Sequence, residues 1–261
     1  MSSLKRIPGI EQVTLTTNGI RLQEFLQSEA IQKRESCIDG INISLDAVDR
    51  KKYAFLTGVD GLKTVLSAID AAAATGVRVK INAVCVDFSR LGFQNADRYE
   101  EIRALAELAK DREIFVRFIE IMPIGYGRNF PGIPHSELIP YMFRRYPGMV
   151  RDTSVYGNGP AVYYAIEHFK GRIGFISAIC EGFCDSCNRL RLTADGFLKS
   201  CLCYDTGVDL RAILRSGESD EKPDQAVRDA IMAVIRSKPG EHSFLTGKNI
   251  TEKKTMAAIG G

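Results

Sequence analysis

The sequence predicts an α/β fold built on parallel strands, followed by a C-terminal region of different character. In the first half, β-rich runs alternate with helical patterns, which is typical of parallel strands joined by covering helices. Beyond residue 150 this alternation stops, and residues 161–179 contain two β-rich runs around Lys-Gly-Arg, which indicates a β-hairpin. We therefore expect a (β/α) domain over residues 1–149 and a second region, containing the hairpin, over residues 150–261.

The predicted elements of the first region follow one another regularly. β-rich runs that end in polar or glycine residues cover positions 12–19, 40–46, 77–84 and 114–122. Apolar side chains at helical spacing cover positions 61–76 and 97–111, and again 223–239 near the end of the chain. Asp97 and Glu100 fit a capping box. The spacing suits a TIM-type barrel or an open doubly wound sheet, because both place helices between parallel strands.

Composition and charge restrict the class of protein. The 261 residues carry a net charge of +3, which is too small to indicate a nucleic-acid binder. No apolar run has the length of a membrane span, and residues 1–12 lack the apolar core of a secretion signal. We therefore expect a cytoplasmic protein with no nucleic-acid or membrane partner. In the reducing cytosol, clustered cysteines point to metal binding or catalysis before disulfides.

Three cysteines near the end of the chain form a candidate metal centre. Cys184 and Cys187 make a C-x-x-C turn that aims two thiolates the same way, and Cys201 follows on the next expected strand. Thiolates hold both structural zinc, which takes four ligands, and iron–sulfur clusters, which with three ligands keep one iron open. Cys180 and Cys203 lie close enough in sequence to supply a fourth ligand. Zinc, an iron–sulfur cluster and inert thiols therefore all remain open from the residues alone.

Two arginines stand between these cysteines. Arg189 and Arg191 are spaced i, i+2, so on a strand they point to the same side. Two fixed guanidinium groups beside thiolates could neutralise them or hold an anion such as a phosphate. A solvated pair of surface arginines is the simpler alternative.

Polar side chains also interrupt or end the strands expected in the first region. In parallel α/β folds such residues gather at the carboxyl ends of the strands, where ligands bind. Lys80 is the most informative, because an ammonium group at a strand centre requires a cavity or an anion. We expect a common pocket, and the residues concerned are Thr16, Thr17, Asn18, Ser44, Asp46, Lys80, Asn82, Arg117, Glu120 and Met122.

Taken together, these segments resemble the radical S-adenosylmethionine GTP 3′,8-cyclases of molybdenum cofactor biosynthesis. The resemblance runs over essentially the whole chain. It is carried by TTNG at 16–19, INISLD at 41–46, VKIN at 79–82, RFIEIMP at 117–123, FCDSCNRLRLTADG at 183–196 with Cys201, and the terminal Gly-Gly. The cysteine–arginine segment is highly specific, whereas each strand motif is weaker alone but stands in the order of the family.

The resemblance implies a role for each matching residue. A C-terminal [4Fe–4S] cluster with one open iron would be held by Cys184, Cys187 and Cys201. GTP would contact Thr16, Lys80, Arg189, Leu190 and Arg191. S-adenosylmethionine would contact Ser44 and Met122. The catalytic residues would be Arg189, Arg191, Gly260 and Gly261, the last two on a tail that enters the active site.

The resemblance also implies the fold, the reaction and the partners. The fold would be a radical S-adenosylmethionine (β/α) barrel with a cluster-binding C-terminal region. The enzyme, a lyase, would use a 5′-deoxyadenosyl radical to convert GTP to (8S)-3′,8-cyclo-7,8-dihydroguanosine 5′-triphosphate. Cyclic pyranopterin monophosphate synthase would act next in the pathway, and a homodimer is compatible with the resemblance.

One part of the family pattern, which lies near the N-terminus in the family, has no counterpart before residue 180. The family holds a first [4Fe–4S] cluster with C-x-x-x-C-x-x-C, but the cysteines before residue 180 are only Cys37 and Cys85. A Gly-Gly-Glu-Pro segment is missing as well. The expectation is therefore a partial barrel, an N-terminally truncated enzyme that is inactive alone. A non-catalytic zinc-binding module and an auxiliary iron–sulfur electron-transfer module are the alternatives.

Overall fold

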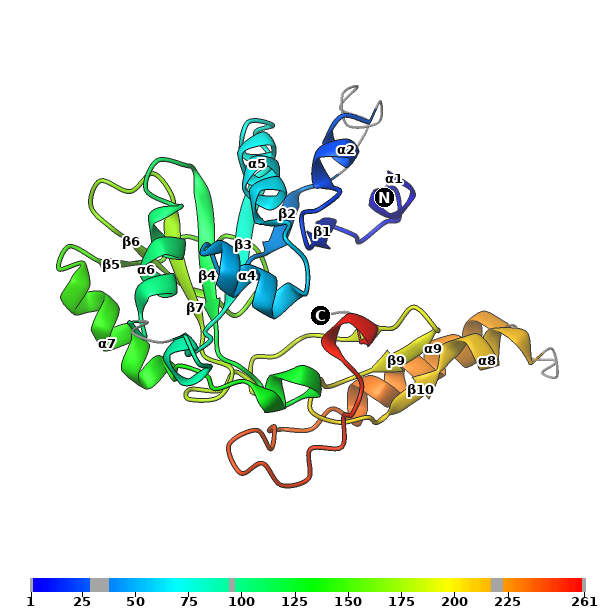
Figure 1. Ribbon diagram of the computed structural model, residues 1–261. Coiled ribbons are helices and arrows are strands. Elements are labelled where there is room, and N and C mark those ends of the chain that lie inside the picture. Colours follow the sequence, from blue (N-terminus) through cyan, green and yellow to red (C-terminus); the bar gives the residue numbers. More distant parts are fainter. Residues whose placement is uncertain (1, 29–37, 94–96, 217–222, 260–261) are drawn as a thin grey trace. The chain divides into compact units, whose positions relative to one another are not determined.

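The computed structural model describes residues 2–28, 38–93, 97–216 and 223–259 of the chain (Figure 1). The chain forms two compact units. The first consists of Met1–Ile121 and Pro131–Ser177, and the second consists of Met122–Phe130 and Ala178–Gly261. Of the helices within the described ranges, none is long and apolar enough to cross a lipid bilayer.

The first unit is built on a mixed sheet, which confirms the α/β class. Its strands are β1 (Thr14–Thr17), β2 (Gly40–Ser44), β3 (Arg78–Val84), β4 (Ile114–Ile119), β5 (Val150–Asp152), β6 (Val162–Ala165) and β7 (Arg172–Ile176). Their order across the sheet is β1-β2-β3-β4-β7-β6-β5. Strands β1 to β4 and β7 run parallel, whereas β5 and β6 pair antiparallel at one edge. Each of the four β-rich runs expected in the first half contains one of the parallel strands.

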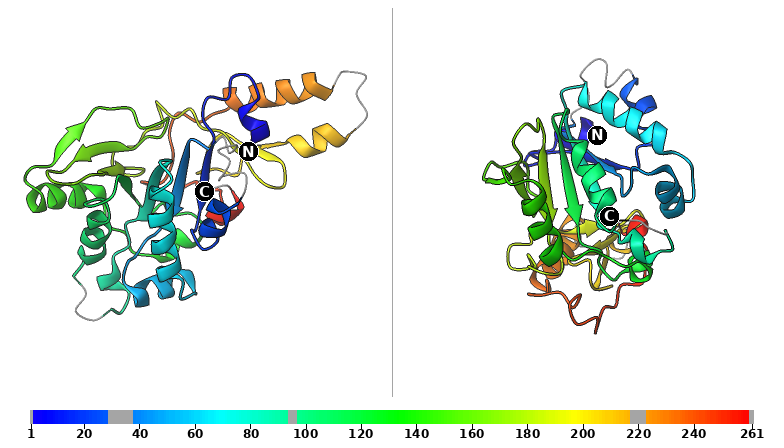
Figure 2. Two further views of the ribbon diagram at one scale, coloured as in Figure 1. Left: turned by 90° about the horizontal axis from the view of Figure 1, so that it is seen from above. Right: turned by 60° about the vertical axis from the view of Figure 1, so that its left-hand side comes forward.

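The strand order shows how the first unit is wound. Its helices are α1 (Ser2–Lys5), α2 (Leu22–Leu26), α4 (Arg50–Thr57), α5 (Leu62–Ala73), α6 (Glu100–Glu107) and α7 (His135–Arg145). Strands β1 to β4 lie side by side in chain order. Because crossovers between parallel strands are right-handed, this order places the connecting helices on one face of the sheet. Figures 1 and 2 show α5, α6 and α7 along one face of the sheet. The sheet is therefore singly wound, and the doubly wound alternative was wrong.

The two faces of this sheet differ in chemistry because side chains alternate along each strand. Toward the helices, β2, β3 and β4 present buried apolar side chains: Ile41, Ile43, Val79, Ile81, Ala83, Ile114, Val116 and Phe118. Helix α5 packs its own buried stripe against them, from Leu62 and Val65 to Ala68, Ile69 and Ala72. The opposite face carries the polar residues Thr16, Asn42 and Lys80, which are paired in register across β1, β2 and β3.

The predicted hairpin is present, since β6 pairs antiparallel with β7 through Tyr163 and Gly174. Both strands belong to the sheet of the first unit, which ends at Ser177. The boundary that we expected between residues 149 and 150 falls at the start of β5. The two compact units of the structure instead meet along the chain near Ser177. The strand pairing explains this difference, because β7 lies directly beside β4 and continues the parallel sheet.

The capping box expected at α6 was wrong. The helix begins at Glu100, after an N-cap position at Tyr99 that makes no side-chain cap. The Asp97 carboxylate accepts a hydrogen bond from the Tyr99 amide at 3.0 Å, and its carbonyl accepts one from the Glu100 amide. A separate turn therefore precedes the helix, so Glu100 lies at the first helical position instead of the third.

The second unit combines a small antiparallel sheet with two helices. Its strands are β8 (Arg191–Leu192), β9 (Phe197–Lys199) and β10 (Gly207–Asp209), in the order β10-β9-β8. Helices α8 (Leu210–Arg215) and α9 (Pro223–Arg236) follow, and Leu198, Leu210 and Val234 form a buried cluster there. A second buried cluster consists of Ile124, Leu202, Cys203, Phe244 and Ile259.

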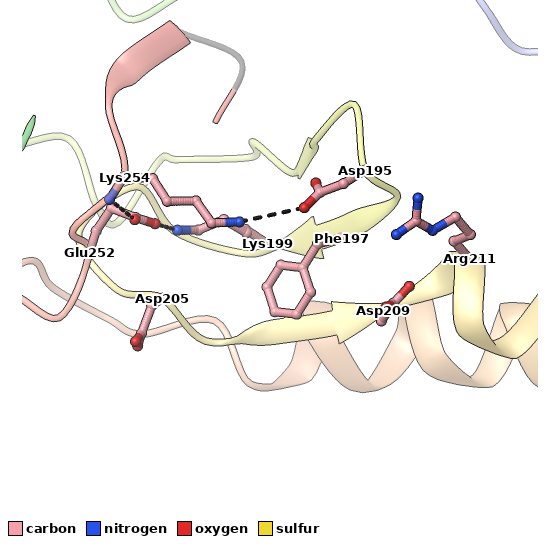
Figure 3. A pocket seen from close by; sticks show the side chains of 8 residues that line it. All are labelled: Asp195, Phe197, Lys199, Asp205, Asp209, Arg211, Glu252 and Lys254. Atoms are coloured by element: carbon pink, nitrogen blue, oxygen red, sulfur yellow. Dashed lines mark hydrogen bonds and ion pairs between the residues drawn. The ribbon is translucent and has the colours of Figure 1, made fainter. Parts of the chain in front are cut away.

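A buried ion pair ties strand β9 to the C-terminal segment of the second unit. Lys199 and Glu252 pair with each other, and both side chains are 2% exposed. The Lys254 amide donates a hydrogen bond to the other Glu252 oxygen at 2.7 Å. The pair borders a pocket of about 140 Å³ (Figure 3), lined by Asp195, Phe197, Lys199, Asp205, Asp209, Arg211, Glu252 and Lys254. Because it joins residues 53 positions apart, this contact fixes the path of the tail beyond β9.

Candidate functional site

The cysteine segment of the second unit forms a turn followed by two paired strands. The Cys187 amide donates a hydrogen bond to the Cys184 carbonyl at 3.1 Å, which closes the C-x-x-C turn. Strand β8 then pairs antiparallel with β9, with Arg191 opposite Lys199. Because β9 returns along β8, Cys201, two residues beyond its end, comes back toward the turn.

The three thiols influence one another electrostatically. Burial raises the pKa of Cys184, a hydrogen bond from the His242 backbone amide opposes that rise, and the charges of Cys201 and Cys187 add to it. Burial also acts to raise the pKa of Cys187, but the Arg189 amide and the charges of Lys238 and Arg189 outweigh it, so this pKa is lowered. A thiol that loses its proton readily is suited to bind a metal, because the thiolate is the ligand.

Both predicted arginines lie half-buried in the same segment. Burial lowers the pKa of Arg189, and that of Arg191 is lowered by burial and by the charge of Arg189. The Arg189 guanidinium lies over the Phe183 ring at 5.0 Å from its centroid. Within the described ranges, neither arginine forms an ion pair with a carboxylate, and the favourable charges nearby are those of Cys187 and Cys201. Two poorly solvated cations beside thiols therefore favour an anionic occupant over a solvated surface pair.

Lys238 is a residue of this site that the sequence analysis missed. Its ammonium group donates hydrogen bonds to the Arg189 carbonyl at 2.8 Å and to the Ser200 carbonyl at 3.0 Å. One side chain thus joins the segment that carries the arginines to the segment that leads into Cys201. No local pattern could have identified it, because the contacts span 49 and 38 residues.

The donor set fits an iron–sulfur cluster. Among the residues described, no three His, Cys, Asp or Glu side chains are grouped closely enough to hold a single metal ion. The chemistry of the three cysteines nevertheless matches a [4Fe–4S] cluster, which takes thiolates at separate iron atoms. Cys203 is fully buried in the apolar cluster with Ile124 and Phe244, and Cys180 is exposed.

The polar face of the first unit holds a second group of predicted residues. The Asn42 side-chain nitrogen donates a hydrogen bond to the Thr16 hydroxyl at 3.2 Å, and the Arg117 guanidinium donates one to the Asn42 side-chain oxygen at 2.9 Å. Lys80, in register with Asn42, donates to the Tyr156 carbonyl. The structure therefore brings Thr16 and Lys80 to one face of the sheet.

The electrostatics of this face favour an anionic ligand. Burial lowers the pKa of Lys80 to about 8, and the charges of Arg117 and Arg78 contribute to the shift. Asn82 follows Lys80 by two positions on β3. Its side-chain oxygen is buried and has no hydrogen-bond partner within the described part of the chain. A half-buried lysine among arginines gains most from an anion, because an anion restores its preference for the charged form.

The remaining predicted residues lie in different parts of the chain. Ser44 ends β2 and is exposed on the polar face, in register with Asn82. Met122 belongs to the second unit, where it packs against the cluster of Ile124 and Ile259. Leu190 is exposed between the two arginines. Gly260 and Gly261 lie outside the described residues, directly after Ile259, which is fully buried.

Comparisons with known proteins agree on one group of relatives. Residues 114–244 match the family described as Molybdenum Cofactor Synthesis C. The GTP 3′,8-cyclase of Clostridium perfringens strain 13 is 37% identical over 262 residues, which cover 100% of this chain and 76% of that protein. Molybdenum cofactor biosynthesis protein moc-5 of Caenorhabditis elegans is 38% identical over 253 residues, 95% of this chain and 39% of that protein.

Among solved structures, Streptococcus suis SuiB bound to S-adenosylmethionine matches with a TM-score of 0.49 and 15% identity. The match covers 86% of this chain and 50% of that one.

Proposed function

This chain belongs to the GTP 3′,8-cyclase family of molybdenum cofactor biosynthesis, and from that premise we propose that it binds GTP beside a [4Fe–4S] cluster held by Cys184, Cys187 and Cys201. The reaction served is the conversion of GTP to (8S)-3′,8-cyclo-7,8-dihydroguanosine 5′-triphosphate by radical S-adenosylmethionine chemistry. The first unit is the corresponding part of a (β/α) barrel, in keeping with its singly wound sheet. The observation that carries the proposal is the pair of half-buried arginines in the cysteine segment, which have no carboxylate partner among the residues that the structure describes.

The cysteine–arginine segment binds the guanine end of the nucleotide. When bound, the cluster supplies an iron with an open coordination position for the purine ring. Arg191 begins β8 and Arg189 lies two residues before it, and Lys238 holds their segment against the one before Cys201. Their charges offset the negative charge of the thiolates and of the nucleotide.

The polar face of the first unit is suited to a phosphate group. Lys80 donates to the Tyr156 carbonyl without a nucleotide, and it exchanges this neutral acceptor for a phosphate oxygen. Thr16, held by Asn42, supplies a hydroxyl beside it. By the family resemblance we also propose that Ser44 and Met122 contact S-adenosylmethionine, and that Gly260 and Gly261, which lie outside the described residues, serve catalysis.

Before residue 180 these residues hold only Cys37 and Cys85, and the C-x-x-x-C-x-x-C spacing at Cys180, Cys184 and Cys187 shares two cysteines with the proposed C-terminal cluster. Reductive cleavage of S-adenosylmethionine needs iron next to its sulfonium group, and thiolates are the ligands that hold such iron. We therefore propose that these residues by themselves bind the nucleotide and the C-terminal cluster but form no 5′-deoxyadenosine. Its release from the reconstituted, reduced chain would contradict this part of the proposal.

Anaerobic reconstitution tests the main proposal. We expect a brown chain with about four irons, and a change in the cluster's electron paramagnetic resonance spectrum when GTP is added. Arg191→Lys should weaken that response, because lysine lacks the planar fork of donors, whereas Arg228→Lys on the exposed face of α9 should not. A colourless chain with one zinc would support the zinc module, and a cluster indifferent to GTP would support the electron-transfer module.

A further inference from the structure

A buried nitrogen beside the cysteine segment has no partner in the structure. His242 is half-buried, and its Nε2 atom is buried without a hydrogen bond to any of the residues that are described. Its other ring nitrogen, Nδ1, accepts a hydrogen bond from the Phe244 amide at 3.3 Å. A buried polar atom without a partner is costly and uncommon, so its cause in this chain requires an explanation.

The bond at Nδ1 determines what the free nitrogen can do. An imidazole nitrogen that accepts a hydrogen bond carries no proton, so in the neutral ring the proton lies on the other nitrogen. His242 therefore presents an Nε2–H group, which is a donor. It requires an acceptor, and in the described chain without a cluster it has none.

The position of the ring indicates the acceptor. The His242 backbone amide hydrogen-bonds to the Cys184 thiol, so the residue lies directly against the C-x-x-C turn. A Cβ atom added to Gly182, two residues before Cys184, would lie 4.0 Å from Nε2. The next residue, Ser243, contributes a backbone hydrogen bond to the Cys203 thiol. Residues 242–243 therefore line the cysteine segment, and the unsatisfied donor lies on this side of the unit.

We propose that His242 is a positioning residue for the cluster, whose Nε2–H donates a hydrogen bond to a sulfur atom of the cluster or of its Cys184 ligand. The inference rests on the proposed cluster and adds to it a residue in contact with the ligands. Such contacts orient the ligands and tune the centre. A hydrogen bond to sulfur stabilises the reduced, more negative cluster and so raises its reduction potential.

Two substitutions distinguish the hydrogen bond that His242 donates from the space that its ring fills. His242→Phe keeps a ring of similar size and removes the donor, whereas His242→Gln keeps an N–H group at a comparable position. Glu241→Gln, an exposed change one residue away, is the matched control. Each chain is examined both without iron and after anaerobic reconstitution.

The inference predicts a small effect in one state and a large effect in the other. Without the cluster, His242→Phe should melt close to the temperature of the unsubstituted chain, because the loss of the unpaired buried donor offsets the loss of the Nδ1 acceptor of the Phe244 amide. With the cluster, it should lose iron to a chelator roughly 10- to 100-fold faster and have a lower reduction potential. His242→Gln should restore both properties in large part, and Glu241→Gln should change neither.

Three outcomes would overturn the inference. The first is a His242→Phe chain whose iron release and potential equal those of the unsubstituted chain. The second is a lower melting temperature of cluster-free His242→Phe, which would indicate an ordinary structural role. The third is a histidine nitrogen bound directly to iron, seen by electron paramagnetic resonance of the protein labelled with ¹⁵N-histidine. If the unsubstituted chain takes up no iron and sulfide, the proposed function fails and the inference fails with it.

Discussion

Replacing Lys80 by methionine should weaken GTP binding at neutral pH and remove most of its dependence on pH. Lys80 lies half-buried on the polar face of the first unit, and burial together with Arg117 and Arg78 lowers its pKa to about 8. Its ammonium group is proposed to hold a phosphate. Only the protonated form can do so, and therefore affinity depends on the fraction of Lys80 that is protonated before binding.

The magnitude follows from this pKa. At pH 7 Lys80 is largely protonated, and its loss removes a charge-assisted hydrogen bond worth about 1.5–3 kcal/mol, or roughly 10- to 100-fold in Kd. A bound phosphate returns the lysine pKa toward its ordinary value of about 10.4. At about pH 9, Lys80 must take up a proton when GTP binds, and this protonation costs free energy. GTP should therefore bind roughly tenfold more weakly at about pH 9 than at about pH 7.

Isothermal titration calorimetry with GTP at about pH 7, about pH 8 and about pH 9 measures both effects. Lys63→Met, an exposed lysine on α5, is the matched control and should behave as the unsubstituted chain. Ionisation of guanine affects all three chains equally and cancels in their ratios. The reasoning would be refuted if Lys80→Met bound GTP normally, or if it retained the full tenfold loss at high pH.

Three further predictions concern the stability of the chain, each read from urea denaturation. Lys199→Met should lower the free energy of unfolding by about 3–5 kcal/mol, because it leaves the buried Glu252 carboxylate without its cation. Adding Glu252→Met should recover most of that loss. Equal losses in the single and double variants would contradict this reasoning. Burial raises the pKa of Asp46 to about 6, so the stability that this carboxyl contributes is full below about pH 4 and is lost as the pH rises through 6. Asp46→Asn should therefore be more stable than the unsubstituted chain by up to about 3 kcal/mol at neutral pH, but not at about pH 4. The same difference at both pH values would exclude this cause. A Cβ atom at Gly171 would lie 2.0 Å from a backbone carbonyl oxygen, so Gly171→Ala should lower the free energy of unfolding by more than about 2 kcal/mol. Gly240→Ala, where nothing lies within 4 Å of the added atom, should be neutral. Similar values for the two variants would show that the close approach at Gly171 is absent.

The elements of the fold were predictable where the pattern was local. The runs at 40–46 and 77–84 became β2 and β3 because alternating apolar residues bury one face of each strand. Helix α7 was not predicted, since it begins directly after a Pro- and Gly-rich segment and contains Pro140. The choice between singly and doubly wound sheets was also out of reach, because it depends on which strands become neighbours.

The candidate site divides in the same way. Cys184, Cys187, Arg189 and Arg191 were identified from spacing, since the chemistry of a C-x-x-C turn depends on residues a few positions apart. Lys238 carries no such pattern and is recognised only by what it bonds to.

The sequence by itself determined which chemical groups this protein possesses and which of them are neighbours along the chain: the thiols, the paired guanidinium groups and the strands that alternate with helices. Only the tertiary structure decided that His242 faces the C-x-x-C turn, that Lys238 joins two segments of the site and that Lys80 lies among arginines. The reason is that hydrogen bonds and charge interactions depend on distance in space, and residues tens of positions apart acquire their distances only when the strands and helices between them have packed.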